Sequence, residues 1–495
     1  MASQFPSSAI PKLISQLLED PQLPRTNPTT AFWQLPPHPL TIIQSPELPE
    51  KTDFAIIGSG VTGCSIAKTL LDESSSSSTS TITVFEARAL TSGATGRSGG
   101  SLTSFVPADY PLLSQYFGHQ QAVKIARFAN RTLDKMHELG NSSKESLEAS
   151  EVRRLQDIIC FLDEESFQRA KEAVKLYEQH VVEDAGFAEV LSAEEALSRF
   201  NVKCGGGAII APNGAFWPYR LITLLWSQLY DKYRSRLAIE THTPVTAIAY
   251  EAKTNPEHPY ILTTPRGVVR ATKIIHATNG YTGHLLPKLR GKIFPLRGTM
   301  STQKAPAEFG RVGAERGWGF HHTPRFDEQT GTYETGLYYA NQNPKTGDIF
   351  IGGEKVRADE IFVSDDTTLS AISQENLSTV LPKFFDKGWK EGEQPEVRQI
   401  WSGIMGFTAD HLPLVGKLPL SMTERGEDGG EWIAAGFNGY GMPQCWSSGE
   451  AVAKMLLGVD VSSFLPEVYE ATEERLTDEQ RMSPEAAVRV LLGSE

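Results

Sequence analysis

The sequence has few cysteines, no long apolar run and no excess of basic residues. Its four cysteines, Cys64, Cys160, Cys204 and Cys445, form no CxxC pair, which excludes a disulfide framework and zinc-finger spacing. No run of 18 apolar residues occurs, so we expect no membrane-spanning helix and no membrane partner. The formal net charge is −13, whereas nucleic-acid binding needs a basic surface, so we expect no nucleic-acid partner.

Targeting signals are also missing from both ends of the sequence. Residues 1–12 lack the basic and apolar segments of a secretory signal, and the last residues, L-G-S-E, form no peroxisomal address. We therefore expect a cytoplasmic protein. Residues 1–50 are rich in proline and leave room for one short helix at 12–19, which predicts a leader that wraps over the surface.

The first regular segment of the chain predicts a βαβ unit. The sequence D-F-A-I-I-G-S-G-V-T-G-C predicts a buried strand at 54–57, a glycine turn and an amphipathic helix at 61–71. A serine-rich insert at 74–80 is expected as an exposed loop, and a second strand, T-I-T-V-F-E, ends at Glu86. A right-handed crossover between parallel strands follows from this order.

The glycines of this unit have the spacing of a dinucleotide site. Gly58, Gly60 and Gly63 stand between strand and helix, where N–H groups and the helix dipole favour a pyrophosphate. Glu86 follows 23 residues after Gly63, near the spacing of a carboxylate that binds ribose hydroxyls. The same carboxylate disfavours a 2′-phosphate, which leaves FAD or NAD rather than NADP. The alternative is a chance glycine turn without a ligand.

A second glycine-rich stretch, S-G-A-T-G-R-S-G-G-S-L, begins at Ser92, six residues after Glu86. Glycine and serine clusters are typical of turns and linkers. The stretch contains no lysine and no G-x-x-x-x-G-K-[ST] register, which excludes a P-loop kinase or ATPase. Its place after Glu86 indicates a segment that crosses in front of a long cofactor lying on the sheet.

The remaining sequence alternates between helical and strand-like patterns. Helices are predicted from 112 onward and at 166–183, 219–233, 368–381 and 448–457. A hairpin is expected to turn at 266–267 before a buried strand at 273–277. Strand-like pieces between 290 and 390 predict an antiparallel sheet in a second domain. At 495 residues the chain is too long for one compact core.

Several motifs in order resemble the D-amino-acid-oxidase-like (DAO) family of FAD-dependent oxidoreductases, which includes sarcosine, glycine and polyamine-type oxidases. They are I-I-G-S-G-V-T-G, F-E-A-R, S-G-A-T-G-R-S-G-G, H-A-T-N-G-Y, P-L-R-G, W-S-G-I-M-G-F-T-A-D-H-L-P-L-V-G and A-G-F-N-G-Y-G-M, and the resemblance spans about residues 30–470. It implies an α/β fold (α+β overall), with a Rossmann-like FAD-binding domain and a second, substrate domain built on an antiparallel sheet plus helices. FAD is the implied cofactor.

The resemblance divides the chain and assigns residues to the cofactor. It implies a leader at 1–50, a discontinuous FAD-binding domain at 51–105, 205–288 and 397–460, a substrate-binding domain at 106–204 and 289–396, and a peripheral tail at 461–495. The implied cofactor-binding residues are Gly58, Ser59, Gly60, Val61, Thr62, Gly63, Glu86, Ala87, Arg88, Ser92, Gly93, Ala94, Thr95, Arg97, Ser98, Gly99, Gly100, Ser101, Val245, Thr278, Asn279, Gly280, Gly403, Asn438, Gly439, Tyr440, Gly441 and Met442.

The sequence departs from the family pattern at four places. Gly403 stands where sarcosine-oxidase-type members carry a flavin-tethering cysteine, which implies non-covalent FAD. Met442 and Pro443 replace a lysine that anchors a substrate carboxylate, so a simple amino acid is disfavoured as substrate. Phe350 stands near the position of a lysine that assists oxygen in some relatives, and Ser101 replaces a histidine.

The predicted activity is oxidation of a C–N bond in an amine-type small molecule by hydride transfer to flavin N5, with O2 as acceptor. The first alternative is an FAD-dependent oxidase or dehydrogenase of a non-amino-acid natural product, including oxidative cyclisation, and a less favoured one is a non-catalytic flavin-binding scaffold. The histidines at 321, 322 and 411 have no metal-ligand spacing, so no metal site is expected. The candidate catalytic residues are Arg297, Tyr338, Tyr339, Trp401 and Tyr440.

Overall fold

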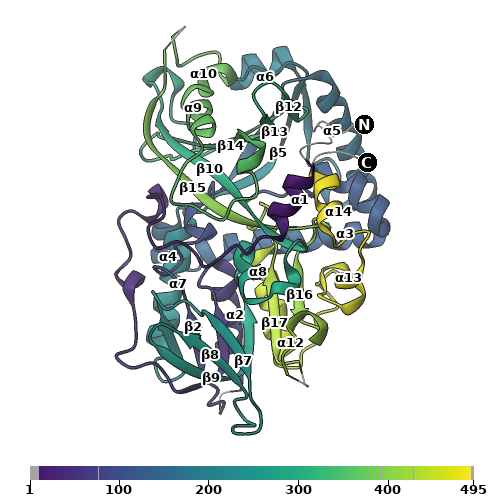
Figure 1. Cartoon of the computed structure of the whole chain (residues 1–495). Coiled ribbons are helices and arrows are strands. Elements are labelled where there is room, and N and C mark those ends of the chain that lie inside the picture. Colours follow the sequence, from purple (N-terminus) through teal and green to yellow (C-terminus); the bar gives the residue numbers. More distant parts are fainter. Residues whose placement is uncertain (1–9, 76, 391–392, 427–428, 492–495) are drawn as a thin grey trace.

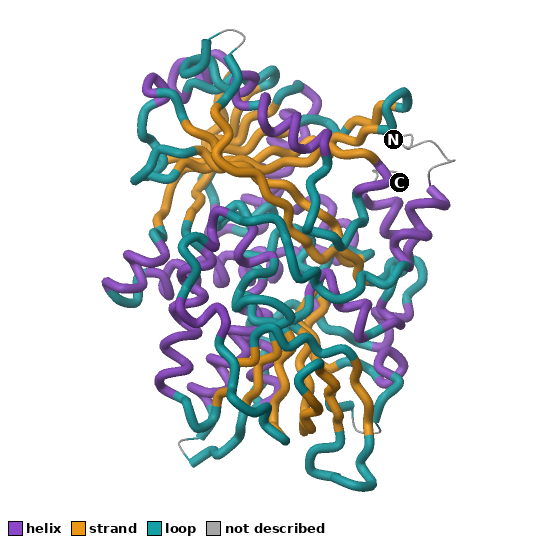
Figure 2. The backbone as a smooth tube through the Cα atoms, turned by 60° about the vertical axis from the view of Figure 1, so that its left-hand side comes forward, coloured by secondary structure: helices purple, strands orange, loops and turns teal. Residues whose placement is uncertain are grey.

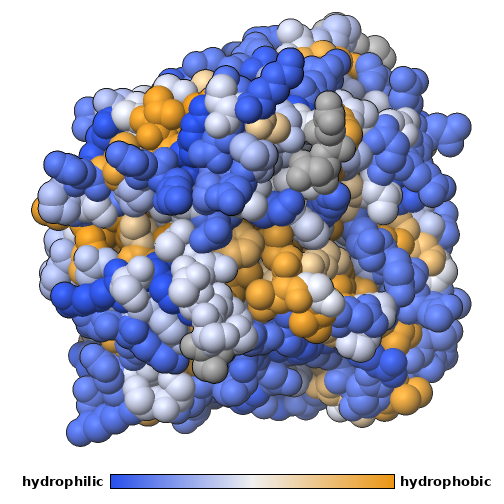
Figure 3. Space-filling model, turned by 90° about the horizontal axis from the view of Figure 1, so that it is seen from below, coloured by the Kyte–Doolittle hydropathy of each residue, from blue (hydrophilic) through white to orange (hydrophobic). Residues whose placement is uncertain are grey.

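The computed structural model describes residues 10–75, 77–390, 393–426 and 429–491. Two sheets form separate layers, with helices and loops between them (Figures 1 and 2). Seen from below, the surface is mostly hydrophilic, and apolar side chains gather near the middle of that face (Figure 3). Ser76, part of the predicted serine-rich insert, and residues 1–9 of the predicted leader lie outside the described residues.

The first sheet contains the predicted βαβ unit. Its main path runs β16-β17-β9-β1-β2-β6, and β17, β9, β1, β2 and β6 are parallel neighbours. β7 pairs with β8, and β8 forms with β9 an antiparallel hairpin that turns just before Gly267, where the sequence predicts a hairpin turn at 266–267. Its strands are β1 (Lys51–Ile57), β2 (Ile82–Phe85), β6 (Leu237–Glu240), β7 (Ala247–Tyr250), β8 (Tyr260–Thr264), β9 (Gly267–His276), β16 (Leu414–Lys417) and β17 (Glu431–Ala435).

Helices from distant parts of the chain cover this sheet. Their apolar side chains form one core with the strands, in which Ile56, Ile66, Trp226 and Val452 are buried. α3 begins earlier than predicted and contains a break at Gly118, whose φ is +77°. The helices are α2 (Val61–Glu73), α3 (Val106–Gly140), α4 (Lys144–Ser150), α7 (Pro218–Lys232), α8 (Thr282–Leu285) and α12 (Cys445–Leu456).

The second sheet is mixed rather than purely antiparallel. Its path is β15-β10-β14-β13-β11-β3-β5-β4, with β12 paired to β13, and β3 runs parallel to β11. β10 and β15 form a long ladder that pairs Lys304 with Glu396 at one end and Ile293 with Thr408 at the other. The strands are β3 (Arg153–Phe161), β4 (Glu189–Ser192), β5 (Gly207–Ala215), β10 (Ile293–Lys304), β11 (Arg316–His321), β12 (Arg325–Asp327), β13 (Thr332–Gln342), β14 (Ile349–Arg357) and β15 (Glu396–Thr408).

Two of these strands lie in the second sheet although the predicted FAD-binding domain contains them. β5 and β15 were expected in the FAD-binding domain, but both pair within the second sheet. The predicted helix at 368–381 is also wrong in extent, because Ser370 caps a shorter helix and Pro382 interrupts its continuation. The helices are α5 (Glu164–His180), α6 (Ala193–Phe200), α9 (Ala371–Thr379) and α10 (Leu381–Phe384).

Residues 471–488 pack into the molecule, although the sequence predicts a peripheral tail at 461–495. Leu476 and Met482 are buried in the same apolar cluster as Leu13 and Leu17 of α1. The guanidinium of Arg475 donates to both carboxylate oxygens of Asp410 at 2.8 and 2.9 Å. The apolar faces of short helices therefore outweigh the polar composition of this stretch. These helices are α1 (Ile10–Leu18), α11 (Leu420–Thr423), α13 (Glu473–Thr477) and α14 (Pro484–Leu491).

Candidate active site

The carboxyl ends of three parallel strands meet at the predicted glycine turn. Ile57 of β1 pairs with Phe85 of β2 and with His276 of β9, so the residues that follow these strands share one edge of the sheet. Gly58 has a φ of +115°, and a Cβ there would lie 2.5 Å from the Ala277 carbonyl oxygen. Crevices at this edge of parallel sheets are where ligands bind.

The other two glycines of the motif permit close packing. A Cβ at Gly63 would lie 2.0 Å from the carbonyl oxygen of Gly58, so α2 can approach β1 only with glycine at this position. A Cβ at Gly60 would lie 2.9 Å from Thr95 Oγ1, and that hydroxyl accepts a hydrogen bond from Val61 N at 3.1 Å. The second glycine-rich stretch therefore lies directly against the N-terminus of α2.

Glu86, at the end of β2, faces the glycine turn. One carboxylate oxygen accepts from the backbone N–H and the hydroxyl of Ser59 at 3.2 and 2.6 Å. The other accepts from Arg88 N at 3.0 Å. The carboxylate thus lies beside the turn at the edge where the sequence predicts a ribose contact.

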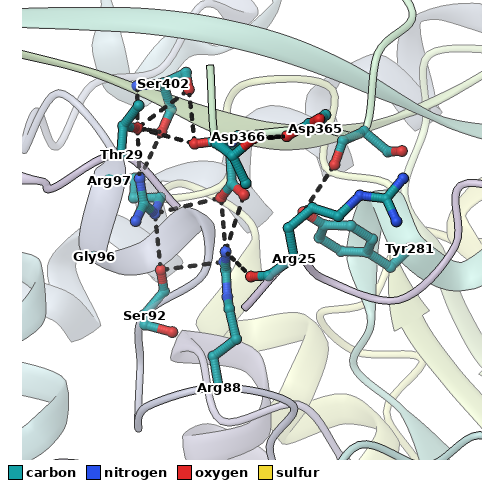
Figure 4. Close-up of polar contacts among 12 residues, drawn as sticks. Arg25, Thr29, Arg88, Ser92, Gly96, Arg97, Tyr281, Asp365, Asp366 and Ser402 are labelled. Carbon is teal, nitrogen blue, oxygen red and sulfur yellow. Dashed lines mark hydrogen bonds and ion pairs between the residues drawn. The ribbon is translucent and has the colours of Figure 1, made fainter. Parts of the chain in front are cut away.

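A buried ion cluster joins the glycine-rich stretch to the second sheet (Figure 4). Arg88 Nη1 donates to both carboxylate oxygens of Asp366 at 3.0 and 2.9 Å, and Arg97 Nε lies 3.6 Å from the same carboxylate. Arg97 also donates to the carbonyl oxygens of Ser92 and Ser402 at 3.0 and 2.7 Å. Burial, with Arg88 nearby, lowers the pKa of Arg97 to about 10, and Asp366 opposes that shift.

The leader also contacts the glycine-rich stretch. Trp33 Nε1 donates to the Ser98 carbonyl at 2.5 Å, and Gln34 Nε2 donates to the carbonyls of Ser92 and Gly96 at 3.1 Å each. The Trp33 ring stacks on Phe350, with centroids 4.2 Å apart. Phe350, which stands near the position of a lysine in some relatives, therefore holds the leader in place. We call residues 20–44 the strap.

The polar groups along this edge fit the predicted FAD. Among the described residues, Arg88 Nε, Ser92 Oγ and Ser98 Oγ are buried without a hydrogen-bond partner. Such groups match a ligand rich in phosphate and hydroxyl oxygens. A Cβ at Gly403 would lie 3.0 Å from Arg97 Cβ, so this position in β15 is closely packed against the glycine-rich stretch.

Residues after β9 and β17 close the same edge. Asn279 Oδ1 accepts from Gly436 N at 3.0 Å, and Asn438 Oδ1 accepts from Thr408 N at 2.8 Å. A Cβ at Gly280 would lie 2.5 Å from the Met405 carbonyl oxygen. These contacts hold together three chain segments that the sequence assigned to the cofactor separately.

Other expected cofactor residues have varied surroundings. Thr278 lies in hydrogen-bond contact with Thr282, and Val245 is buried with Phe85 in an apolar cluster. A Cβ at Gly441 would lie 2.9 Å from Cys445 Sγ, whereas one at Gly93 would meet nothing within 4 Å. The remaining expected residues lie within the same chain segments: Thr62, Ala87, Ala94, Gly99, Gly100, Ser101, Gly439 and Met442.

The structure separates the five candidate catalytic residues. Tyr338 and Tyr339 point to opposite faces of β13, and the Tyr338 hydroxyl accepts from Asn376 Nδ2 at 2.9 Å on the side of α9. The Trp401 indole is fully buried and donates to the Arg97 carbonyl at 2.9 Å. Arg297 Nη1 donates to the Asp365 carbonyl and to Thr368 Oγ1 at 3.3 and 3.1 Å.

Tyr339 and Tyr440 lie together beside the glycine-rich stretch. A Cβ at Gly99 would lie 2.7 Å from Tyr339 Cε2, which places that ring on the backbone of the stretch. Burial raises the pKa of Tyr440, and both Asp109 and Tyr339 raise it further. The Phe105 ring lies 4.0 Å from the Tyr440 ring, centroid to centroid.

Sequence reasoning missed Phe105 and Asp109 beside these tyrosines, and it considered the nearby His321 only as a metal ligand. Phe105 and Asp109 are joined by a backbone hydrogen bond of 3.0 Å at the start of α3, and the His321 ring lies 6.3 Å from the Phe105 ring. The signal was a lone carboxylate in the otherwise apolar stretch S-F-V-P-A-D-Y-P, directly after the glycine-rich stretch. We call the five residues Phe105, Asp109, His321, Tyr339 and Tyr440 the aromatic–carboxylate cluster.

The part of the chain that the structure describes lacks the features of a metal site and of a membrane span. That part contains no group of three or more His, Cys, Asp or Glu residues able to hold a metal ion. No helix within it has the length and apolar composition needed to cross a bilayer.

Comparisons with known proteins match this geometry. A family model described as DAO, FAD dependent oxidoreductase, matches residues 53–455. The comparison with curated proteins gave no match. Glycine oxidase from Geobacillus kaustophilus is 19% identical with a TM-score of 0.59, over 86% of this chain and 99% of that protein. L-proline dehydrogenase from P. horikoshii is 18% identical with a TM-score of 0.61, over 88% of this chain and 100% of that protein.

A third solved structure extends the range of similar proteins. NikD, described as an unusual amino acid oxidase essential for nikkomycin biosynthesis, is 15% identical with a TM-score of 0.60. The similarity covers 88% of this chain and 98% of NikD. At these low identities the solved structures show a shared fold, while the substrates of the three proteins differ.

Proposed function

Because the chain belongs to the DAO family of FAD-dependent oxidoreductases, we propose that it oxidises a C–N bond of an amine. FAD bound at this edge would supply N5 as the acceptor for a hydride from the carbon next to the amine nitrogen. The nitrogen loses a proton, the resulting imine reacts with water or with a second group of the same molecule, and O2 takes up the two electrons. The observation that carries the proposal is the pair Tyr339 and Tyr440 beside the glycine-rich stretch.

The residues that would hold FAD come from the first sheet and its loops. The glycine turn at Gly58 and the N-terminus of α2 favour the pyrophosphate, and Glu86 is positioned for the ribose hydroxyls. The unpartnered atoms of Arg88, Ser92 and Ser98 offer further polar contacts. The closely packed Gly403 stands where sarcosine-oxidase-type members carry the cysteine that tethers the flavin. We therefore propose that FAD is bound non-covalently.

The two tyrosines would orient the substrate rather than remove its proton. The pKa of Tyr440 is raised by burial, by Asp109 and by Tyr339, so its hydroxyl stays protonated at neutral pH. A protonated phenol can donate a hydrogen bond and present an aromatic wall, but it is not a base. The reacting amine must therefore be neutral when it reaches the site, and positioning supplies most of the rate.

The substrate is proposed to be an amine without an essential α-carboxylate. Met442 and Pro443 stand where relatives carry a carboxylate-binding lysine, and neither can pair with an anion. The guanidinium of Arg97 is turned toward Asp366 and Ser402. The same observation favours a second candidate, oxidation or oxidative cyclisation of a non-amino-acid natural product.

Anaerobic mixing of the purified protein with a panel of amines tests the proposal. We expect the protein to contain extractable FAD, a subset of amines to bleach the flavin absorbance, and readmission of O2 to restore it with release of peroxide. Absence of flavin, or a flavin that no amine bleaches, would contradict amine oxidation. If an artificial electron acceptor restores the flavin absorbance and O2 does not, the protein is a dehydrogenase rather than an oxidase.

A further inference from the structure

Asp157 of β3 is a buried carboxylate that the proposed reaction does not use. The residue is 8% exposed, and its Oδ1 has no hydrogen-bond partner among the described residues. Burial raises the pKa of the carboxyl group to about 7, and the Asn213 amide opposes that shift. A buried oxygen without a partner lowers the stability of the fold, and a ligand that donates a hydrogen bond to it removes that cost.

The second sheet presents Asp157 on the face that meets the glycine-rich stretch. Asp157 and Asn341 both pair with Gly317 of β11, from opposite sides, so their side chains share a face and stand about 10 Å apart. Asn341 Nδ2 donates to the Gly99 carbonyl oxygen at 2.6 Å, and the Tyr339 ring on the same face also lies against Gly99. Asp157 therefore belongs to the sheet face that borders the proposed FAD site.

Two glycines leave β11 without side chains on this face. A Cβ at Gly317 would lie 3.3 Å from Asp157 Oδ1 and 3.5 Å from Asn213 Nδ2. For a Cβ at Gly319 the nearest atom is His321 Nε2 at 3.4 Å, so there is room for at least one more carbon. This glycine strip, Gly317 and Gly319, leads from the unpartnered oxygen of Asp157 toward the aromatic–carboxylate cluster, to which His321 belongs.

We propose that Asp157 removes a proton from the ammonium form of the substrate as the amine enters the site. The proposal rests on the proposed amine oxidation, which requires a neutral amine, whereas an alkylamine with a pKa of about 10.4 is almost fully protonated at pH 7. The N–H bond breaks, its electron pair stays on nitrogen, and the proton binds Oδ1 of Asp157. The proton passes to water when the product leaves, which returns the carboxylate for the next turnover.

Burial favours this transfer. An ammonium ion beside a carboxylate would leave two charges out of water, whereas a neutral amine beside a carboxylic acid leaves none. The acid can then donate a hydrogen bond to the amine or to a carbonyl group, and the amine keeps the lone pair that the oxidation needs. Asp157 would thus act before the hydride is transferred.

His321, the nearest other base, is a poorer proton acceptor. Burial and His322 lower the pKa of His321 to about 4, so the Asp157 carboxylate is the stronger base. Arg153, four residues earlier on β3, donates to the carbonyls of Gly313 and Gln342 at 2.7 and 3.0 Å. α5 meets this part of the sheet with the apolar Phe167. The other titratable groups on neighbouring elements are Arg316 of β11, Tyr339 of β13, His137 of α3 and, on the opposite face of β3, Cys160.

Calorimetry in buffers of different ionisation enthalpy counts the protons released when an amine binds, and it tests the proposal. The holoprotein is first reduced with dithionite under anaerobic conditions, so that no hydride transfer follows binding. The probes are propylamine, hexylamine and phenethylamine. At pH 8.5 we expect no net release, because Asp157 takes the proton that the ammonium group loses. At pH 5.5 Asp157 is already protonated, so binding should release about one proton and be at least tenfold weaker.

Asp157→Asn removes the proton acceptor and keeps the size of the side chain. At pH 8.5 only about one in eighty alkylamine molecules is neutral, so the variant should bind at least tenfold more weakly than the wild type and release one proton. Its affinity should approach the wild-type value at pH 10. Glu189→Gln is the control, because Glu189 lies on β4 of the same sheet but is exposed and paired with Arg199. It should change neither the affinity nor the proton count.

The stability of the protein without amine gives a second measurement. A carboxyl group with a raised pKa in the folded state adds stability below its unfolded pKa of about 3.9, and this contribution is lost as the pH rises through about 7. The melting temperature of Asp157→Asn should therefore rise relative to the wild type between pH 5.5 and pH 8.5. An equal difference at both pH values would overturn the proposal. If the variant does not fold, the wild-type proton counts decide.

The results distinguish this proposal from the proposed function. Proton counts that change with pH as expected, without bleaching of the oxidised flavin by any amine, would support the role of Asp157 and contradict amine oxidation. Bleaching by amines, with the same proton count at pH 5.5 and pH 8.5 or with no release by Asp157→Asn at pH 8.5, would retain the reaction and overturn the role of Asp157. Absence of binding by all three amines would contradict both.

Discussion

At Gly63 the absence of a side chain decides how closely α2 approaches β1. A Cβ would lie 2.0 Å from the carbonyl oxygen of Gly58. That oxygen belongs to the backbone and cannot move out of the way independently. We expect Gly63→Ala to lower the free energy of unfolding by about 3 kcal/mol, measured by denaturant titration without FAD. Gly93→Ala is the control, since its Cβ has space and should change stability by less than about 0.5 kcal/mol. Equal effects would contradict the packing argument.

Asp366 is the only carboxylate recorded in ion pairs with Arg88 and Arg97 in the part of the chain described. Its side chain is 0% exposed, so removal of its charge leaves two buried guanidinium groups without compensation. We expect Asp366→Asn to reduce the free energy of unfolding by about 3–5 kcal/mol in urea titration. The neighbouring Asp365→Asn should cost far less, because the Asp365 carboxylate accepts local hydrogen bonds from Thr367. A small effect at Asp366 would show that water reaches the cluster.

At the scale of elements, we expect the strap to contribute more to stability and FAD retention than a leader that only wraps over the surface. Trp33 is 3% exposed, stacks on Phe350 and donates to the Ser98 carbonyl. Trp33→Ala should lower the free energy of unfolding by about 3–5 kcal/mol and weaken FAD retention on dilution, followed by flavin fluorescence. Trp33→Phe keeps the stacked ring and should recover most of the stability. Ile42→Ala, at a side chain 71% exposed, should change neither quantity.

Elements defined by nearby residues were predictable, and contacts between distant residues were not. The βαβ unit followed from Gly58, Gly63 and Glu86 because strand, turn and helix depend on local pattern. The pairing of Arg88 with Asp366 joins residues 278 positions apart, and no local pattern selects that partner. The contact between Phe105 and Tyr440 was missed for the same reason, since it joins the start of α3 to the loop after β17.

At the scale of the whole molecule, FAD should stabilise both sheets together. The sheet edge where we propose that FAD binds is bordered by the first sheet, by Gly403 of the second and by the strap. FAD that binds only the folded state therefore shifts the unfolding equilibrium of the whole molecule. At 100 times its Kd, FAD should add about 2.7 kcal/mol to the free energy of unfolding of the apoprotein. FMN lacks the adenosine that we propose Glu86 binds, and it should add less at equal concentration. An equal shift in melting temperature with FMN would contradict this assignment.

The strap also determines when, during synthesis of the chain, the proposed FAD site becomes covered. Trp33 leaves the ribosome early, but its partner Phe350 and the Thr29 partner Ser402 are made hundreds of residues later. The nascent chain therefore carries the glycine-rich stretch for most of translation while the strap lacks these two partners from the second sheet. At about 5–20 residues per second, that interval lasts tens of seconds, during which FAD can load from the side that the strap later covers.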